Sequence, residues 1–418
     1  MSLRHDADLI MKAALRSALP DTAVQAALEG IQFHAGGRVI LVALGKAAWQ
    51  MAKAAHEALG SRIEDGIVIT KYGHVKGPIG SLRLREAGHP VPDANSFSAT
   101  EEAIRLVSGL KKEDSVLLLI SGGGSALFEL PLIPEQELQS ITDQLLRSGA
   151  DIVEMNTIRK RLSRVKGGRF ARLCEPATVY SVILSDIIGD PLDMIASGPA
   201  YPDSSTRADA LHIAGKYQLI LSKEAEACLS AETPKELFNV HSLVTGSVRG
   251  LCKAAAEEAQ RLGYEPHILT ASLACQAREA GSFLASIAQY HQSSEKSLAL
   301  IAGGETVVKL KGKGKGGRNQ ELALSAAMGI SGLADTAVFS LGSDGTDGPT
   351  DAAGGYADGD TAARLKEEGI DIFRVLEDND AYHALEKCGG LIITGPTGTN
   401  INDLSALLLD PQEGRAGG

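Results

Sequence analysis

The sequence has few aromatic residues and few cysteines. Phe, Trp and Tyr make up 4% of the 418 residues, whereas glycine occurs 46 times. This composition argues against a sandwich of aromatic-rich strands and favours an aliphatic α/β protein with many tight turns. The five cysteines show no CxxC spacing, so the sequence suggests neither a zinc knuckle nor a disulfide framework. We therefore expect reduced thiols.

Long apolar stretches are also missing. No segment approaches the length needed to cross a bilayer, and the N-terminal segment has helical apolar spacing and two aspartates, unlike a signal peptide. These features predict a cytoplasmic protein without a membrane partner. The net charge of −11 argues against a nucleic-acid binder, because neutralising phosphates requires a broad basic surface. A local basic loop is still compatible with a small anionic ligand.

The length of the chain predicts two domains, each with its own core. Apolar runs of strand length, such as VILVAL at 39–44 and SVLLLI at 115–120, alternate with helical patterns. This order predicts an α/β fold in which each domain has a mainly parallel, Rossmann-like sheet flanked by helices. Ligands are then expected at the carboxyl ends of the strands. A strand, helix, strand pattern begins after residue 235, so the predicted domains are 1–235 and 236–418.

Two glycine motifs directly follow predicted strands. The motif SGGGS places backbone N–H groups where they can surround phosphate oxygens, although a simple tight turn is the alternative. Its residues are Ser121, Gly122, Gly123, Gly124 and Ser125. Lys46 follows the strand 39–44, where its ammonium can hold a phosphoryl oxygen. A solvated lysine is the alternative there, but the helix dipole disfavours a cation at a helix start.

Two basic segments are candidates for anion binding. NTIRKRLSRVKGGRFA, at 156–171, has helical spacing, and Lys160 becomes a candidate phosphate ligand if this helix faces the same cleft. An exposed basic face is the alternative. KLKGKGKGGRNQE, at 309–321, places Arg318 after two glycines at the start of a predicted helix, where a guanidinium can clamp an anion. The lysines of this loop are either exposed side chains of a hairpin without a binding role, or they attract anionic substrates.

Aspartate-rich turns follow two other predicted strands. SDIIGDPLDMIASGP contains Asp186, Asp190 and Asp193, and SDGTDGPTDAAGG contains Asp344, Asp347 and Asp351. Their carboxylates are hard oxygen ligands that suit Mg²⁺, which is usually held by one or two carboxylates together with substrate phosphates. Helix capping and turn formation are the alternative roles for these aspartates.

Eight ordered segments between about residues 39 and 404 resemble the class II glycerate kinases, also called the MOFRL family. They are GKAAWQMA, GHPVPD, LISGGGSALFELP, NTIRKRLSRVKGGRFA, SDIIGDPLDMIASGP, GGETVVKLKGKGKGGRNQE, SDGTDGPTDAAG and TGPTGTNINDL. The resemblance implies a two-domain α/β protein with its active site in the interdomain cleft. It also implies ATP- and Mg²⁺-dependent phosphorylation of D-glycerate, normally at the 2-hydroxyl.

The resemblance implies roles for particular residues as well. Lys46 and Arg318 match the proposed catalytic cations, and residues 121–125 match a phosphate-binding loop. Glu305, in the segment GGETVV, is assigned to the same cofactor site. The expected partners are ATP and D-glycerate, and the expected state is a monomer or a small homo-oligomer.

Two other functions are weighed against the kinase. A hydroxypyruvate reductase would need a dinucleotide-binding motif, but no GxGxxG follows the first predicted strand. The second predicted strand ends in Lys71 and Tyr72, where an NAD site needs an acidic residue. A non-catalytic sensor of phosphosugars or nucleotides could use the glycine loop without turnover. The several aspartates and the two candidate cations argue for catalysis instead.

Overall fold

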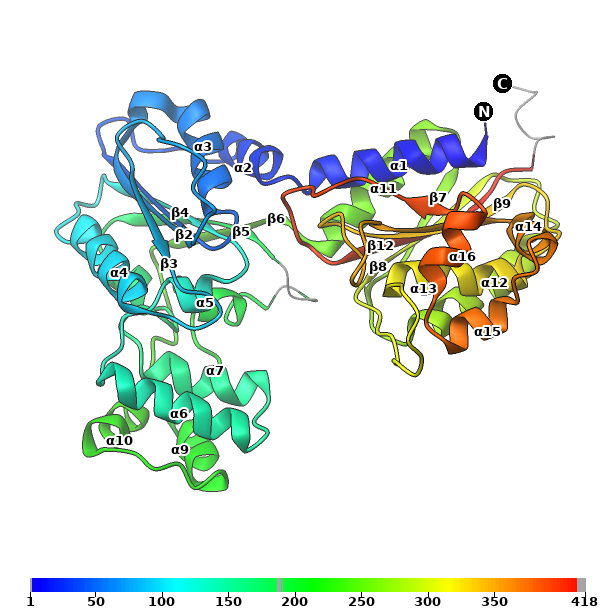
Figure 1. Ribbon diagram of the computed structural model, residues 1–418. Coiled ribbons are helices and arrows are strands. Elements are labelled where there is room, and N and C mark those ends of the chain that lie inside the picture. The colour runs from blue at the N-terminus through cyan, green and yellow to red at the C-terminus, as the bar shows by residue number, and fades with distance from the viewer. Residues whose placement is uncertain (1, 186–188, 190, 412–418) are drawn as a thin grey trace. The chain divides into compact units, whose positions relative to one another are not determined.

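The computed structural model describes residues 2–185, 189 and 191–411, and these form two compact units (Figure 1). The first-sheet unit holds Pro20–Ser185 and residues 191–245, and the second-sheet unit holds residues 2–19 and those from 246 on. The sequence predicts a division at residue 235. The structure differs because the strand at 240–246 hydrogen bonds into the first sheet, and because the N-terminal helix packs in the second-sheet unit.

Six strands and nine helices are described in the first-sheet unit. The strands are β1 (Val39–Leu44), β2 (Ile63–Lys71), β3 (Arg83–Ala87), β4 (Ser115–Ile120), β5 (Thr178–Leu184) and β6 (Val240–Gly246). The helices are α2 (Pro20–Glu29), α3 (Ala48–Leu59), α4 (Ala94–Val107), α5 (Gly124–Leu127), α6 (Glu135–Arg147), α7 (Ile152–Arg161), α8 (Arg169–Leu173), α9 (Arg207–Lys216) and α10 (Lys223–Ser230). Two 3-10 turns are η1 (Gly60–Arg62) and η2 (Ile195–Ser197).

The first sheet has the strand order β3-β2-β1-β4-β5-β6, and each neighbouring pair from β3 to β5 is parallel. Side chains alternate between the two faces of a strand. Leu41 of β1 therefore packs with α2 and α3, whereas Val42 packs with α4. The parallel strands bring the carboxyl ends of β1 to β4 to one edge, which is where such sheets bind ligands. Helices α6, α7, α9 and α10 form a separate layer with its own apolar cluster (Figure 1).

Six strands and seven helices are described in the second-sheet unit. The strands are β7 (Glu265–Leu273), β8 (Leu298–Gly304), β9 (Thr336–Gly342), β10 (Gly354–Asp358), β11 (Leu391–Ile392) and β12 (Asp403–Leu409). The helices are α1 (Leu3–Ser17), α11 (Val248–Arg261), α12 (Ala277–His291), α13 (Arg318–Gly329), α14 (Thr361–Glu367), α15 (Ile372–Glu377) and α16 (Ala381–Lys387).

The second sheet has the order β11-β10-β9-β12-β8-β7. Helices α1 and α11 pack on one face, and α12 and α13 pack on the other (Figure 1). The predicted α/β class with helices on both faces is therefore confirmed for both units. This sheet is mixed rather than parallel, because the C-terminal strand β12 lies between β8 and β9 and is antiparallel to both. β12 is a buried apolar run. It is not among the strands expected from the sequence, all of which precede it in the chain.

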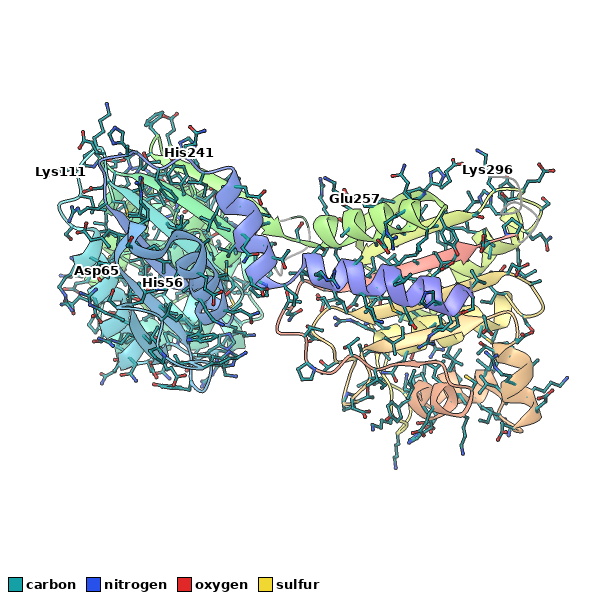
Figure 2. All side chains as sticks on the ribbon, turned by 90° about the horizontal axis from the view of Figure 1, so that it is seen from above. His56, Asp65, Lys111, His241, Glu257 and Lys296 are labelled. Carbon is teal, nitrogen blue, oxygen red and sulfur yellow. The ribbon has the colours of Figure 1, made fainter. Side chains whose placement is uncertain are left out.

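Charged side chains project from the surfaces of both units (Figure 2). Figure 2 shows Lys111 ahead of β4 and Glu257 on the exposed face of α11. Among the described residues, no helix combines the length and the apolarity that a bilayer span requires.

Candidate functional site

The loop Ser121–Ser125 connects β4 to α5 at the carboxyl edge of the first sheet. The backbone N–H groups of residues 122–125 donate no hydrogen bond to any described residue. Gly123 has a φ of +85°, and a Cβ there would lie 3.0 Å from the imidazole of His89 and 3.2 Å from Lys46 Cγ. A row of N–H groups on a glycine-rich loop is suited to the oxygens of an anion such as phosphate.

Lys46 has a fixed backbone and a free ammonium. Its N–H donates to the carbonyl of Gly122 at 2.9 Å, and the next N–H, of Ala47, donates to the hydroxyl of Ser121 at 3.0 Å. Its own carbonyl lies 3.0 Å from Nδ1 of His74. The ammonium is exposed and makes no hydrogen bond or ion pair within the described part of the chain. Lys46 is thus anchored to the loop and available to a ligand that the loop binds.

The other end of the loop is anchored by residues from η2 and the basic segment 156–171. The hydroxyl groups of Ser125 and Ser197 lie 3.0 Å apart. Lys166 donates to the carbonyl of Ser125 at 2.8 Å, and Arg159 donates to the same oxygen at 3.3 Å. The basic segment therefore contacts the loop through Arg159 and Lys166.

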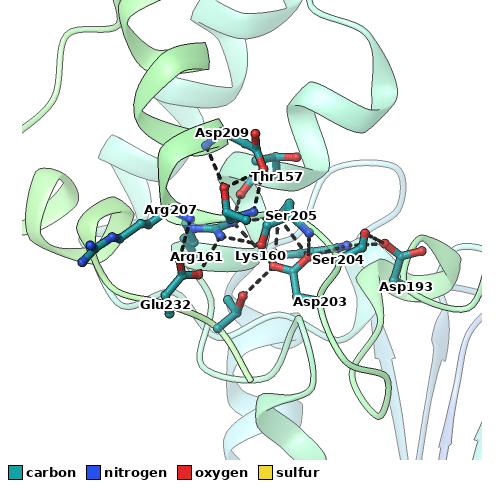
Figure 3. A network of polar contacts seen from close by, with 12 residues as sticks. Thr157, Lys160, Arg161, Asp193, Asp203, Ser204, Ser205, Arg207, Asp209 and Glu232 are labelled. Carbon is teal, nitrogen blue, oxygen red and sulfur yellow. Dashed lines mark hydrogen bonds and ion pairs between the residues drawn. The ribbon is translucent and has the colours of Figure 1, made fainter. Parts of the chain in front are cut away.

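Lys160, which the sequence assigned to ATP binding, lies in a buried ion-pair network (Figure 3). Its ammonium is 3.1 Å from Asp203 and 3.2 Å from Asp193. Arg161 also approaches Asp203, at 3.5 Å. A buried charge needs such partners, because burying an unpaired ion costs a large desolvation free energy. The charge of Lys160 is neutralised within the protein, and its contact with a ligand stays a prediction.

Arg318 begins α13 in the second-sheet unit, and two carboxylates hold its guanidinium. Nε and Nη2 donate to the two carboxylate oxygens of Asp403 at 2.6 and 2.9 Å, and Nη1 donates to Glu305 at 2.9 Å. A guanidinium has five N–H donors, so these contacts leave two for a ligand. Burial lowers the pKa of Arg318, but Asp403 and Glu305 raise this pKa by more, so the side chain stays charged.

Asp347 caps the N-terminus of α13. Its carboxylate accepts hydrogen bonds from the N–H groups of Asn319 at 3.2 Å and Gln320 at 2.9 Å. A Cβ on Gly317 would lie 2.3 Å from the carboxylate carbon, so a glycine is required there. Because a carboxylate already occupies this helix start, the positive charge available to a ligand comes from the side chain of Arg318.

The lysines that precede α13 lie beside an acidic turn. Lys311 pairs with Glu377 at 3.2 Å, and the ammonium of Lys315 lies 4.0 Å from the ring centre of Tyr382. Backbone N–H groups of this loop donate to the side chains of the turn 378–380. The ion pair with Glu377 therefore accounts for one of the positive charges concentrated in this segment.

Residues 6–230 match the family described as domain of unknown function (DUF4147), and residues 298–403 match the MOFRL family. A D-glycerate 2-kinase from Thermotoga maritima is 52% identical over 409 residues, which cover 96% of this chain and 97% of that protein. The chain belongs to the glycerate 2-kinase family.

A crystal structure of a glycerate kinase from Thermotoga maritima has a TM-score of 0.91 to this glycerate 2-kinase family member. The two chains are 51% identical, and the match covers 98% of this chain and 99% of that one. A protein from Agrobacterium vitis named putative hydroxypyruvate reductase is 39% identical over 421 residues, 98% of this chain and 95% of that protein. Relatives of this glycerate 2-kinase family member therefore carry both kinase and reductase names.

Two residues beside the predicted ones are not singled out by the sequence pattern. His89 lies against Gly123, and Asp403 holds the guanidinium of Arg318. His89 and Asp403 lie in the segments GHPVPD and TGPTGTNINDL, which carry the family resemblance. That resemblance is the only signal that could have found them, because Asp403 is 85 residues from Arg318.

Of the predicted metal ligands, Asp344 lies in a turn of the second-sheet unit. Its Oδ1 accepts hydrogen bonds from the N–H of Thr346 at 2.9 Å and from the hydroxyl of the same residue at 3.1 Å, as the turn-forming alternative predicts. Asp186 and Asp190 lie outside the described residues. Within the described residues, no group of three or more His, Cys, Asp or Glu side chains could hold a metal ion. The second oxygen of Asp344 has no hydrogen-bond partner among the described residues, and a carboxylate oxygen is a ligand type that Mg²⁺ accepts.

Proposed function

We propose that this protein transfers the γ-phosphoryl group of ATP to the 2-hydroxyl of D-glycerate. The observation that carries the proposal is the loop Ser121–Ser125, whose N–H groups at 122–125 have no acceptor among the described residues. The side chain of Lys46 lies against Gly123 of this loop, and its ammonium has no described partner. The Thermotoga maritima relative, named D-glycerate 2-kinase, supplies the substrate and the position of transfer.

Phosphoryl transfer needs positioned charge more than covalent chemistry from the protein. In this proposal the loop holds phosphate oxygens of ATP, and Lys46 places its ammonium against them. Arg318 uses its two remaining N–H donors to bind an anionic group of the reactants, while Glu305 and Asp403 orient it. A Mg²⁺ ion bound with ATP would neutralise part of the triphosphate charge, and Asp344 would contribute a carboxylate oxygen to it.

The reductase and the sensor are less well supported. β2 ends at Lys71, so the first sheet provides a cation where an NAD ribose needs a carboxylate. A sensor would not need Lys46 and Arg318, the two cations that still have N–H donors available for a reacting group. The cytoplasmic location and the state of monomer or small homo-oligomer stay predictions.

The direct test is to incubate the purified protein with ATP, magnesium and D-glycerate and to follow the products by phosphorus NMR. The resonances of 2- and 3-phosphoglycerate are resolved, so one experiment reports both activity and position of transfer. We expect 2-phosphoglycerate and ADP. Oxidation of reduced nicotinamide by hydroxypyruvate, without ATP consumption, would instead establish the reductase.

Removal of divalent metal is expected to abolish this turnover, because the triphosphate would otherwise face the carboxylates near Asp344 with net repulsion. Excess chelator should stop product formation, and magnesium should restore it. Chelator saturated beforehand with magnesium is the control for effects of the chelator itself. Undiminished phosphorylation in excess chelator, with no bound metal found by elemental analysis, would disprove the metal requirement.

Gly123→Val is expected to weaken ATP binding by at least about tenfold. A left-handed backbone costs a residue with a Cβ about 1–2 kcal/mol, and here the valine would also crowd His89 and Lys46 at the loop. Calorimetric titration with ATP measures the affinity, and chemical unfolding measures the stability of the same variant.

Gly109→Val is the matched control for this variant. Gly109 has a similar φ, +75°, but a Cβ there would meet nothing within 4 Å. It should lose a comparable free energy of unfolding and keep its affinity for ATP. Unchanged ATP affinity in folded Gly123→Val would show that the loop does not hold the phosphates.

A further inference from the structure

Four neighbouring strands place the loop and three basic side chains at one edge of the first sheet. Lys46 follows β1, Lys71 ends β2 and His89 follows β3, while the loop Ser121–Ser125 follows β4. These strands are adjacent and parallel, so their carboxyl ends lie at the same edge. His89 belongs to the segment GHPVPD.

The imidazole of His89 lies directly against the loop. A Cβ on Gly123 would be 3.0 Å from its Cδ2, 3.1 Å from its Nε2 and 3.2 Å from Cγ of Lys46. His89 and Lys46 therefore border the same point of the loop, beside N–H groups without a described acceptor. Within the described ranges, neither ring nitrogen of His89 forms a hydrogen bond, although the side chain is half-buried. Because no described residue occupies its nitrogens, this ring is available to a ligand.

The surroundings of His89 disfavour a positive charge in the free protein. Burial, followed by the charges of Lys46, Lys71 and His74, lowers the pKa of His89. The imidazole is therefore neutral at neutral pH when nothing is bound.

The carboxylates that flank His89 along the chain are engaged elsewhere. Glu86 accepts a hydrogen bond from the N–H of Val75 at 2.9 Å, and Asp93 accepts one from the hydroxyl of Tyr72 at 2.6 Å. Neither of these two carboxylates is therefore available to pair with His89.

We propose that His89 is a ligand-binding residue of the loop, whose imidazole takes up a proton when a phosphoryl group binds and then donates a hydrogen bond to it. The ligand class is a phosphate dianion, such as the terminal group of a nucleoside triphosphate. A dianion between Lys46 and His89 attracts a proton to the ring, and a hydrogen bond between two charged groups is stronger than a neutral one. The inference rests on the proposed function only in that the loop binds the phosphates of ATP.

Proton uptake gives ATP binding a defined dependence on pH. The pKa of His89 lies below its ordinary value in the free protein, and the bound dianion raises it. Between these two values the complex holds more protons than the free protein, so affinity rises as pH falls, by up to about tenfold per pH unit. Below the pKa of His89 in the free protein, proton uptake by His89 no longer increases the affinity for ATP.

Calorimetry of ATP binding, in buffers with different ionisation enthalpies, counts the protons taken up by the full-length protein. His89→Gln keeps a hydrogen-bond donor but cannot titrate. His241→Gln is the matched control, because His241 is an exposed histidine on β6 (Figure 2). Titration of ATP itself is common to all three proteins and cancels in the comparison.

We expect the wild-type protein and His241→Gln to take up more protons than His89→Gln at pH 7. His89→Gln should bind ATP about tenfold more weakly at pH 6, where a charged donor is lost, and the difference should shrink at pH 8. Equal proton uptake in the three proteins, or no binding of ATP to the wild-type protein, would overturn the inference.

Histidine-ring NMR of the wild-type protein tests the same inference without relying on a variant. The titration midpoint of one ring should rise when ATP is added, and unchanged midpoints with ATP bound would overturn it. Product formation from glycerate is assayed separately. Preserved proton uptake without phosphorylation of glycerate would contradict the proposed function alone.

Discussion

Lys46→Ala is expected to lower kcat/KM for the phosphorylation of glycerate by about 10³, the scale on which charged groups that stabilise a transferring phosphoryl group act. The ammonium of Lys46 forms no hydrogen bond or ion pair with any other described residue. Its backbone, by contrast, is hydrogen bonded to Gly122. The substitution removes the charge without removing a side-chain hydrogen bond or ion pair of an exposed residue, so the free energy of unfolding should change by less than about 0.5 kcal/mol.

Steady-state kinetics and chemical unfolding of the same preparation separate these two effects. Lys53→Ala is the control, because Lys53 lies on α3 shortly after Lys46 and pairs with Glu57 on the exposed surface of that helix. It should keep its kinetic constants, since such a pair contributes less than about 1 kcal/mol. Full activity in folded Lys46→Ala would remove Lys46 from the mechanism.

The place of the loop Ser121–Ser125 in the fold could be predicted from the sequence because its signal is local. Ser121–Ser125 follows a buried apolar run, and Lys46 follows another, so strand order alone brings them to one edge of the sheet. The packing of these strands is equally local, since fully apolar runs predict buried parallel strands. The positions of Lys46 and the loop in the fold thus follow from short stretches of neighbouring residues.

The position of β12 could not be predicted in this way. Residues 403–409 form an apolar run like the others, and nothing in the run says that it lies antiparallel between β8 and β9. The two carboxylates of Arg318 depend on that placement, because Asp403 is the first residue of β12. Contacts between residues so far apart in the chain are set by the whole sheet.

The basic segment 156–171 shows a different limit of prediction from the sequence. Neighbouring residues of an α-helix point about 100° apart, so Arg159 and Lys160 of α7 have different surroundings. Arg159 contacts the carbonyl of Ser125, whereas Lys160 is buried with Asp203. The helical pattern predicts the helix, but which of its cations faces the loop depends on how α7 packs.

Arg318→Lys is expected to be nearly as damaging as the loss of Lys46, although it keeps the positive charge. A lysine cannot reproduce the two parallel hydrogen bonds from Nε and Nη2 to Asp403 together with the third to Glu305. Asp403 is 5% exposed, so losing these donors should cost stability, by about 1–3 kcal/mol. The two N–H donors left for a ligand are lost with them.

The kinetic constants then show what Arg318 binds. If it meets the transferring phosphoryl group, kcat should fall by about 10³. If it holds the carboxylate of glycerate equally in the ground and transition states, KM for glycerate should rise while kcat stays nearly constant. Assays at a temperature well below the unfolding transition keep the stability loss from affecting either constant.

Two lysines of the preceding loop are controls with the same sign of charge. Lys313 has no side-chain partner in the described part of the chain, and Lys311 has an exposed pair with Glu377. Lys313→Ala and Lys311→Ala should have small effects that shrink further at high salt, because exposed charges act mainly by attracting ligands over a distance. Near wild-type kcat and KM in folded Arg318→Lys, beside a large loss in either lysine variant, would show that a lysine of the loop, not Arg318, is the cation that serves the reaction.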